Sequence, residues 1–201
     1  MEISWVLDVS GTITAENFKQ TQRFVKSVMS RIGLGHGNKV AVTIFGNEGQ
    51  QKIFCSNFTR IPDFLNAVDG LPRLPKEYTN TRDGLEKGQE LLENFGCGEH
   101  KETNKLIVLL TDGLANRGVG QENGLIEAAK KIQNHHKTTI LVVAVGKFSN
   151  RQLIKMVPEE HIKTQAAGFD DLTSEKFIHE VKKAACKTVV TTIRGKADIA
   201  F

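Results

Sequence analysis

Two apolar segments that each end in an acid constrain this chain more than any other feature. Residues 3–7 are rich in β-forming side chains, and residues 105–110 are apolar at almost every position. A strand that is apolar on both faces is typical of a parallel sheet with helices on both sides. The first segment ends at Asp8 and the second is followed by Asp112, so each strand presents an acid at its carboxyl end. Ligands bind at this end of open α/β sheets.

Helical and strand patterns alternate along the rest of the chain. Strands are expected in 3–7, 39–45, 51–55, 105–110, 139–145 and 162–167. Helices are expected in 15–32, 61–68, 82–95, 123–134, 151–156 and, capped by Asp171 or Thr173, up to Cys186. The turn at 46–49 makes its two flanking strands a hairpin. We therefore predict an α/β fold: a doubly wound, mostly parallel six-stranded sheet with one antiparallel edge strand and helices on both faces.

Length and composition fit one globular domain. The chain has 201 residues, of which 39% are hydrophobic and 25% are charged. Its net charge of +4 is too small to argue for a nucleic-acid partner, and no apolar segment approaches the roughly 20 residues of a membrane-spanning helix. We expect a domain over 1–186 and a tail or linker over 187–201. Because the chain opens directly on a strand, we expect a domain excised from a longer protein, with any signal peptide outside it.

Three polar loops should meet at the carboxyl edge of the sheet. They contain Asp8, Ser10 and Thr12, then Thr79, then Asp112. Two carboxylates and several hydroxyls form an all-oxygen site at the surface, which suits Mg²⁺, Mn²⁺ or Ca²⁺ and not zinc. Two carboxylates only balance the charge of the ion, and neutral hydroxyls add none. The metal would therefore remain electrophilic and could accept one more anionic ligand from outside.

This arrangement resembles the von Willebrand factor type A domain, also called the integrin I domain. The resemblance covers about residues 3–186 and rests on residues 8–12 (Asp-Val-Ser-Gly-Thr), 78–81 (Tyr-Thr-Asn-Thr) and 109–113 (Leu-Leu-Thr-Asp-Gly). In that family the matching positions form the metal-ion-dependent adhesion site. The resemblance thus implies a metal ligand set of Asp8, Ser10, Thr12, Thr79 and Asp112. Thr12 stands where the family usually has serine, which keeps the hydroxyl and adds a methyl group.

The resemblance implies adhesion rather than catalysis. A Glu or Asp of a partner protein would complete the coordination of the metal, and collagen or another matrix protein is the commonest partner in the family. A surface adhesin that binds a host-cell receptor is an alternative. Residues expected on the ligand face are Thr12, Thr79, Arg82 and Arg117, and the two arginines could pair with further acids of the partner. Neither a nucleic-acid partner nor direct membrane insertion is expected.

The cysteines and a sequon bear on the compartment. Cys55 and Cys97 should both lie toward the sheet edge opposite the metal, where a disulfide between them would close about 40 residues and contribute about 4 kcal/mol. Asn57-Phe58-Thr59 makes Asn57 a glycosylation site if the protein is secreted. Cys186 matches a family position whose disulfide partner precedes the first strand. Together these features favour a secreted or extracellular glycoprotein.

Two other interpretations stay open. Residues 6–13 also resemble the Asp-x-Asp-Gly-Thr nucleophile loop of haloacid-dehalogenase-like phosphatases. Ser10 replaces the second acid of that loop, and a serine cannot shuttle a proton near neutral pH. Thr79 and Asp112 would also have no role in such an enzyme. The second interpretation is an intracellular type A domain that serves as a scaffold in a complex; a free-thiol assay on native protein would separate it from the secreted one.

Overall fold

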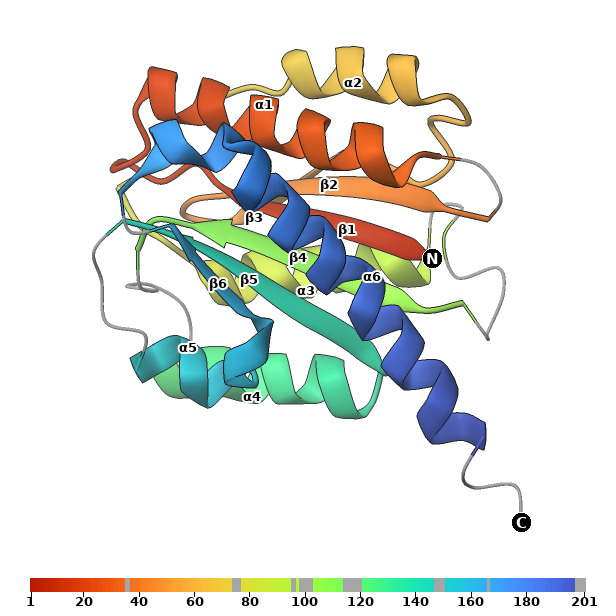
Figure 1. The fold of residues 1–201 in the computed structure, drawn as a ribbon. Coiled ribbons are helices and arrows are strands. Elements are labelled where there is room, and N and C mark those ends of the chain that lie inside the picture. Colours follow the sequence, from red (N-terminus) through yellow and green to blue (C-terminus); the bar gives the residue numbers. More distant parts are fainter. Residues whose placement is uncertain are drawn as a thin grey trace.

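The computed structural model describes residues 1–34, 37–73, 77–94, 97, 103–113, 121–146, 151–165 and 167–197. The strands of this part are β1 (Glu2–Asp8), β2 (Lys39–Phe45), β3 (Gly49–Ile53), β4 (Lys105–Thr111), β5 (Thr138–Val145) and β6 (Ile162–Gln165) (Figure 1). Its helices are α1 (Ala15–Ile32), α2 (Ile61–Asp69), α3 (Thr81–Glu93), α4 (Gln121–Asn134), α5 (Arg151–Met156) and α6 (Glu175–Ala197), with short 3-10 helices η1 (Glu159–His161) and η2 (Phe169–Thr173). Within the described ranges, no helix has the length and apolar character needed to cross a bilayer.

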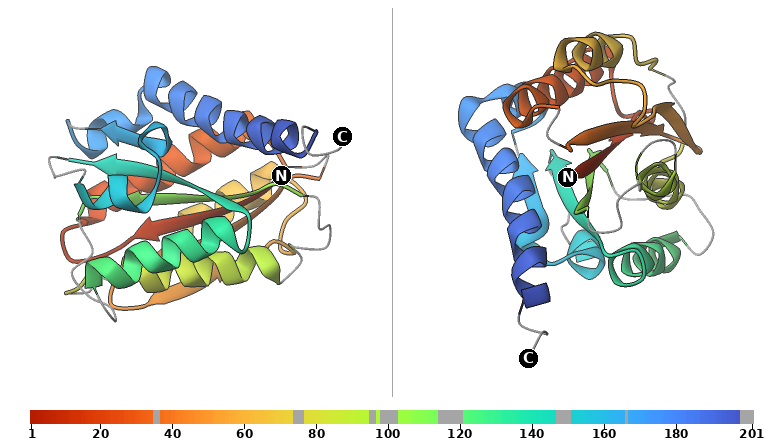
Figure 2. Two further views of the ribbon diagram at one scale, coloured as in Figure 1. Left: turned by 90° about the horizontal axis from the view of Figure 1, so that it is seen from below. Right: turned by 90° about the vertical axis from the view of Figure 1, so that its right-hand side faces the viewer.

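The strands form one sheet in the order β3-β2-β1-β4-β5-β6. All neighbouring pairs are parallel except β2 and β3, which form an antiparallel hairpin at one edge. Helices α1, α2 and α6 cover one face of the sheet, and α3, α4 and α5 cover the other (Figure 2). The predicted doubly wound, mostly parallel six-stranded sheet with one antiparallel edge strand is confirmed.

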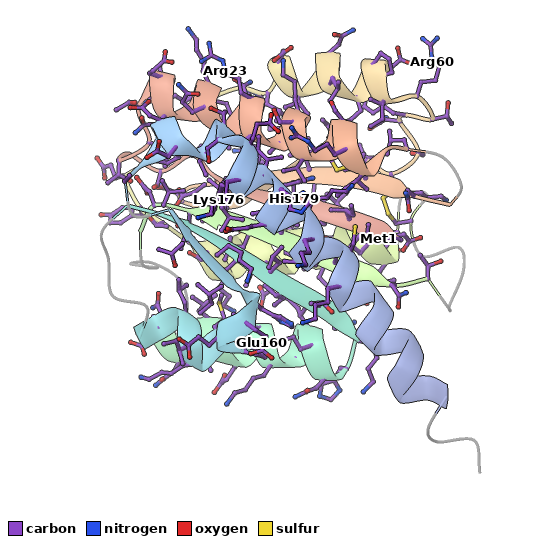
Figure 3. The ribbon with its side chains drawn as sticks, viewed as in Figure 1. Met1, Arg23, Arg60, Glu160, Lys176 and His179 are labelled. Carbon is purple, nitrogen blue, oxygen red and sulfur yellow. A yellow bond between two sulfur atoms is a disulfide. The ribbon has the colours of Figure 1, made fainter. Side chains whose placement is uncertain are left out.

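Central strand β1 is fully buried because β2 and β4 pair with its two edges and helices pack on both of its faces. Trp5 packs on the α1 side, where its ring meets Phe24 edge-on at a centroid distance of 6.0 Å. Val6 points to the opposite face, toward α3. Outside this layer, Lys176 and His179 lie exposed on the outer side of α6 (Figure 3). The carboxyl ends of the parallel strands meet at the left edge of Figure 1, where the predicted metal loops begin.

Two glycines let α3 approach the sheet unusually closely. A Cβ atom at Gly88 would lie 2.5 Å from Cγ2 of Val6, and one at Gly84 would lie 2.8 Å from Cγ of Phe45. Real Cβ atoms do not tolerate such distances, so only glycine fits at this depth. The close approach holds the amino end of α3 at the carboxyl edge of β1 and β2.

We expect Gly88→Ala to lower the free energy of unfolding by about 1–3 kcal/mol, because the added methyl group overpacks the contact with Val6. Denaturant unfolding followed by circular dichroism would measure the loss. Gly70→Ala is the matched control, since the nearest atom to its Cβ is 3.5 Å away and the residue has a helical φ of −82°. Equal stability of the Gly88 variant and the wild type would contradict this account of the helix position.

Some boundaries differ from the predictions because local polar contacts decide where elements begin and end. Strand β3 starts at Gly49 and ends at Ile53, two residues earlier than predicted, because the turn is tighter. Cys55 therefore follows the strand instead of lying on it. Strand β6 ends at Gln165, also two residues before its predicted end.

The start and the end of the last helix were both predicted wrongly. Asp171 and Thr173 belong to η2, and Ser174 Oγ accepts the hydrogen bond from the backbone N–H of Phe177 at 3.4 Å. Serine is among the preferred residues for this capping role. The helix also continues past Cys186 to Ala197, because the intervening sequence contains no proline. The proposed boundary between a domain over 1–186 and a tail over 187–201 therefore falls inside α6.

Cys55 and Cys97 are joined by a disulfide with Cα atoms 5.3 Å apart. Both residues are buried, with 4% of their surface exposed. The pair lies beyond the end of β3, and β3 runs opposite to the parallel strands, so the disulfide lies toward the edge away from the predicted metal loops. Cys186 is an exposed free cysteine.

Candidate metal centre

Asp8 is fixed at the end of β1 by hydrogen bonds to both carboxylate oxygens. The backbone N–H of Ser10 donates to Oδ1 at 2.8 Å, and the hydroxyl of Thr111 donates to Oδ2 at 2.7 Å. Because Thr111 ends the neighbouring strand β4, this second bond ties the two central strands together at their carboxyl ends. The carboxylate is thus held in one orientation without any positively charged partner in these contacts.

A chain of hydroxyl contacts continues from this carboxylate to the second acid. Ser10 Oγ and Thr12 Oγ1 lie 3.3 Å apart, and Thr12 Oγ1 donates a hydrogen bond to Oδ1 of Asp112 at 2.9 Å. Four of the five predicted metal ligands are therefore brought into one cluster. Sequence analysis did not assign a role to Thr111, although its place directly before the acid in the Thr-Asp-Gly segment was the available signal.

Thr79, the fifth predicted ligand, lies in the segment directly before α3 and is 6% exposed. Its neighbours hold this segment against the turn between β2 and β3. The backbone N–H of Asn80 donates to the carbonyl of Gly46 at 2.7 Å, and that of Tyr78 donates to Oδ1 of Asn47 at 3.1 Å. Thr79 is thereby placed at the same edge of the sheet as the four-residue cluster.

The site has a buried floor and an exposed rim, so the expected position at the surface holds for Thr12 and Asp112 but not for Asp8 and Ser10. Asp8 is 0% exposed and Ser10 is 1% exposed, because strands on both sides enclose the end of β1. Asp112 is half-buried and Thr12 is exposed. A ligand arriving from solvent would therefore meet Thr12 and Asp112 before the deeper oxygens.

Burial raises the pKa of both acids. For Asp8 the pKa rises to about 6, since loss of hydration outweighs the hydrogen bonds from Thr111 and Ser10 that favour the charged form. The pKa of Asp112 is also raised by burial, against the opposing hydrogen bond from Thr12. Both carboxylates therefore lack compensating positive charge, which a divalent cation would supply. This donor set of acids and hydroxyls fits a hard cation.

In the absence of metal, we expect the free energy of unfolding to fall as the pH rises from about 4 to about 6. Asp8 has a folded-state pKa above its unfolded value of 3.8, so the folded protein binds more protons in this window and its charged form opposes folding above it. The change due to this group is about 3 kcal/mol. Unfolding in EDTA at several pH values would measure it. An unchanged pH profile in Asp8→Asn would contradict the assignment.

The predicted ligand face is only partly described. Nε of Arg82 pairs with Oε1 of Glu86 at 2.9 Å, one turn along α3, so an acid of a partner would have to compete with this ion pair. Arg117 lies outside the described residues. Tyr78 was not selected as a site residue from the sequence; it directly precedes Thr79 and is 40% exposed.

Asn57 is exposed in the turn after β3, as a glycosylation acceptor must be. Its Oδ1 accepts a hydrogen bond from the backbone N–H of Phe54 at 2.6 Å, which leaves the acceptor nitrogen Nδ2 out of this bond. Glycosylation of Asn57 stays a prediction, and mass spectrometry of protein from its natural source would test it.

A model of the von Willebrand factor type A domain matches residues 2–183. The chain belongs to this family. The match spans every strand of the described sheet and ends within α6, in agreement with the fold and with the order of the three polar loops.

Relatives include two collagen VI chains and a mussel protein. The collagen alpha-5(VI) chain of Mus musculus is 25% identical over all of this chain, and the collagen alpha-1(VI) chain of Homo sapiens is 26% identical over 78% of it. This type A domain spans only 7% and 15% of those chains. Proximal thread matrix protein 1 of the mussel byssus is 26% identical over 92% of this chain and 45% of its own, with a TM-score of 0.77.

Another structure of the mussel protein has zinc in its metal-ion-dependent adhesion motif. It is 24% identical over 92% of this chain and 45% of its own, with a TM-score of 0.77. The zinc belongs to that protein, but it concerns our expectation that an all-oxygen site does not suit zinc. Oxygen ligands favour hard cations, yet a motif of this kind can accept zinc. The donor set alone therefore does not exclude zinc.

Proposed function

We propose that this domain is a non-catalytic adhesion module that binds a protein partner through a divalent metal ion. The observation that supports this most directly is the chain of contacts from Asp8 through Ser10 and Thr12 to Asp112. These oxygens, together with that of Thr79, would hold Mg²⁺, Mn²⁺ or Ca²⁺. When bound, the ion would offer an electrophilic position to a carboxylate arriving from solvent.

The residues of the site have separate roles in this proposal. Asp8 supplies a fixed negative charge at the floor, and Thr111 and Ser10 keep it oriented. Thr12 and Asp112 form the rim that the partner approaches. Two acids only neutralise a divalent ion, so a Glu or Asp of the partner would add the favourable third charge.

The acids and hydroxyls of the site favour binding of a partner protein over hydrolysis of a substrate. A phosphatase of the kind considered above needs an acid at position 10 to move a proton, and Ser10 instead contacts Thr12. The residues that the contacts of the site join are acids and hydroxyls. Asp8 has a raised pKa of about 6 without metal, but a divalent ion bound beside it would hold its carboxylate in the charged form as a ligand, so it would not act as a base. We therefore propose that the domain is not an enzyme.

We propose an extracellular location and a matrix protein, such as a collagen, as the partner. The resemblance to collagen VI chains and to a byssal matrix protein supports this choice. The disulfide between Cys55 and Cys97 agrees with an oxidising compartment. A host-cell receptor or an intracellular complex would be the alternative outcomes of a partner search.

The proposal is tested by surface plasmon resonance against a panel of purified collagens and other matrix proteins, with Mg²⁺ and with EDTA. We expect EDTA to release the bound partner and Mg²⁺ to restore binding. Thr79→Ala should weaken binding roughly tenfold or more without unfolding the domain, because it removes one proposed metal ligand; a tenfold loss corresponds to about 1.4 kcal/mol. Tight binding that EDTA leaves unchanged would show that the partner surface lies elsewhere.

A further inference from the structure

We infer that the turn between β2 and β3, which contributes none of the proposed metal ligands, positions Thr79 for the metal. This inference rests on the proposed metal site and adds to it a set of positioning residues. We call residues 46–49 the hairpin turn. Three kinds of contact support its role: bonds to the segment that holds Thr79, a bond to the first turn of α3, and a bond that joins the loop of Asp8 to Phe45, the residue directly before the turn.

The hairpin turn holds the Thr79 segment from both sides. Before Thr79, the backbone N–H of Tyr78 donates to Oδ1 of Asn47 at 3.1 Å. After it, the backbone N–H of Asn80 donates to the carbonyl of Gly46 at 2.7 Å, and its side-chain Nδ2 donates to the carbonyl of Asn47 at 3.1 Å. On one side of Thr79, Tyr78 is therefore fixed to Asn47, and on the other side Asn80 is fixed to both Gly46 and Asn47.

The hairpin turn is also bound to the start of α3. The backbone N–H of Gly49 donates to Oδ2 of Asp83 at 2.5 Å. The backbone N–H of Asp83 in turn donates to Oδ1 of Asn80 at 3.3 Å, which makes Asn80 the N-cap of the helix. One asparagine thus closes the end of α3 and links it to the hairpin turn, so Thr79 cannot shift without breaking bonds on both of its sides.

The same end of β2 holds the other metal loop. The backbone N–H of Val9 donates to the carbonyl of Phe45 at 2.8 Å, one residue before the hairpin turn begins. Asp8 and Ser10 flank Val9, whereas Thr79 is held by the following residues of the hairpin. The spacing between Thr79 and the Asp8 loop is consequently set by consecutive residues of β2 and its turn, neither of which touches the metal in our proposal.

Asn47 offers the cleanest test because, among the residues that the structure describes, its side chain makes one hydrogen bond, in which Oδ1 accepts from the backbone N–H of Tyr78. Asn47→Ala removes this acceptor, whereas Asn47→Asp keeps an oxygen at the same place. Outer-shell partners of metal ligands typically change metal affinity by about 10- to 100-fold when they are lost. Asn47 holds Tyr78, the neighbour of Thr79, rather than Thr79 itself, so we expect a loss at the lower end of this range, about tenfold, for Mn²⁺ in Asn47→Ala and near wild-type or tighter binding in Asn47→Asp.

The experiment is a calorimetric titration with Mn²⁺ alone of the wild type, Asn47→Ala, Asn47→Asp and Ser174→Ala. Ser174→Ala removes a helix cap in another part of the fold and should lower the melting temperature without changing Mn²⁺ affinity. Measurements in about 0.5 M NaCl, where the Debye length is about 4 Å, reduce the effect of the charge added in Asn47→Asp. Water-proton relaxation by the bound Mn²⁺ should report extra retained water in Asn47→Ala, as displacement of Thr79 requires.

The outcomes separate the two levels of the proposal. If the wild type does not bind Mn²⁺, the proposed metal site is wrong and the positioning role falls with it. If the wild type binds and Asn47→Ala binds equally well, with the same retained water, the metal site stands and the positioning role is overturned. Equal losses of Mn²⁺ affinity in Asn47→Ala and Asn47→Asp would likewise overturn it, since the retained acceptor would then be irrelevant.

Discussion

Replacement of Asp8 by alanine is expected to abolish Mg²⁺ and Mn²⁺ binding while the domain stays folded. The substitution removes the floor carboxylate and leaves Asp112 as the single acid against a divalent charge. Because an all-oxygen site depends on the charge of its carboxylates, we expect the affinity to fall at least about 100-fold. Isothermal titration calorimetry on the wild type and the variant would measure this.

We expect the fold to survive this substitution even though Asp8 is not exposed. Asp8 is fully buried and its pKa is raised, so the metal-free protein gains from losing this charge. That gain offsets the hydrogen bonds lost by Thr111 and Ser10. Asp63→Ala is the control, because it removes an exposed acid from α2 that pairs with Arg60. Unchanged Mg²⁺ affinity in Asp8→Ala would refute the site.

Loss of the Cys55–Cys97 disulfide is expected to lower the free energy of unfolding by about 4 kcal/mol. The bond closes a loop between positions 42 residues apart, and in the chain-entropy model such a loop restricts the unfolded state by this amount. Denaturant unfolding of a Cys55→Ser, Cys97→Ser double variant would measure the effect. Cys186→Ser is the control, since that cysteine is exposed and unpaired.

Mass spectrometry of protein from its natural source provides the independent check on the same disulfide. We expect a cross-linked peptide containing Cys55 and Cys97 and a free thiol at Cys186. Free thiols at both buried positions, or a double variant as stable as the wild type, would contradict the prediction. A disulfide between Cys186 and a cysteine outside this chain would not contradict the predicted bond between Cys55 and Cys97.

The sequence predicted the elements whose pattern is set by burial. Helix α1 and strand β2 begin and end where their apolar residues predict, at Ala15–Ile32 and Lys39–Phe45. Ends that depend on one polar contact were harder to place. Ser174 caps α6 instead of Asp171 or Thr173, and a spacing of apolar residues says nothing about which nearby oxygen reaches the backbone.

In the candidate site, too, some features were predicted from the sequence and others were not. The five proposed ligands stand out because acids and hydroxyls follow buried strands. The burial of Asp8 and the bonds through Asn47 depend on how β1, β2 and α3 meet, and residues distant in the chain make those contacts. The role of Thr111 was missed because its bond to Asp8 crosses from β4 to β1, and its place directly before Asp112 was the signal that could have indicated it.

The most direct test of the central claim is a crystal structure with Mn²⁺ and its anomalous diffraction signal. We predict one strong peak at the carboxyl edge of the sheet, coordinated directly or through water by Asp8, Ser10, Thr12, Thr79 and Asp112. One coordination position should face solvent and be filled by water or by a carboxylate from a neighbouring molecule. No peak among these residues at saturating Mn²⁺, or a peak ligated by other side chains, would contradict the account.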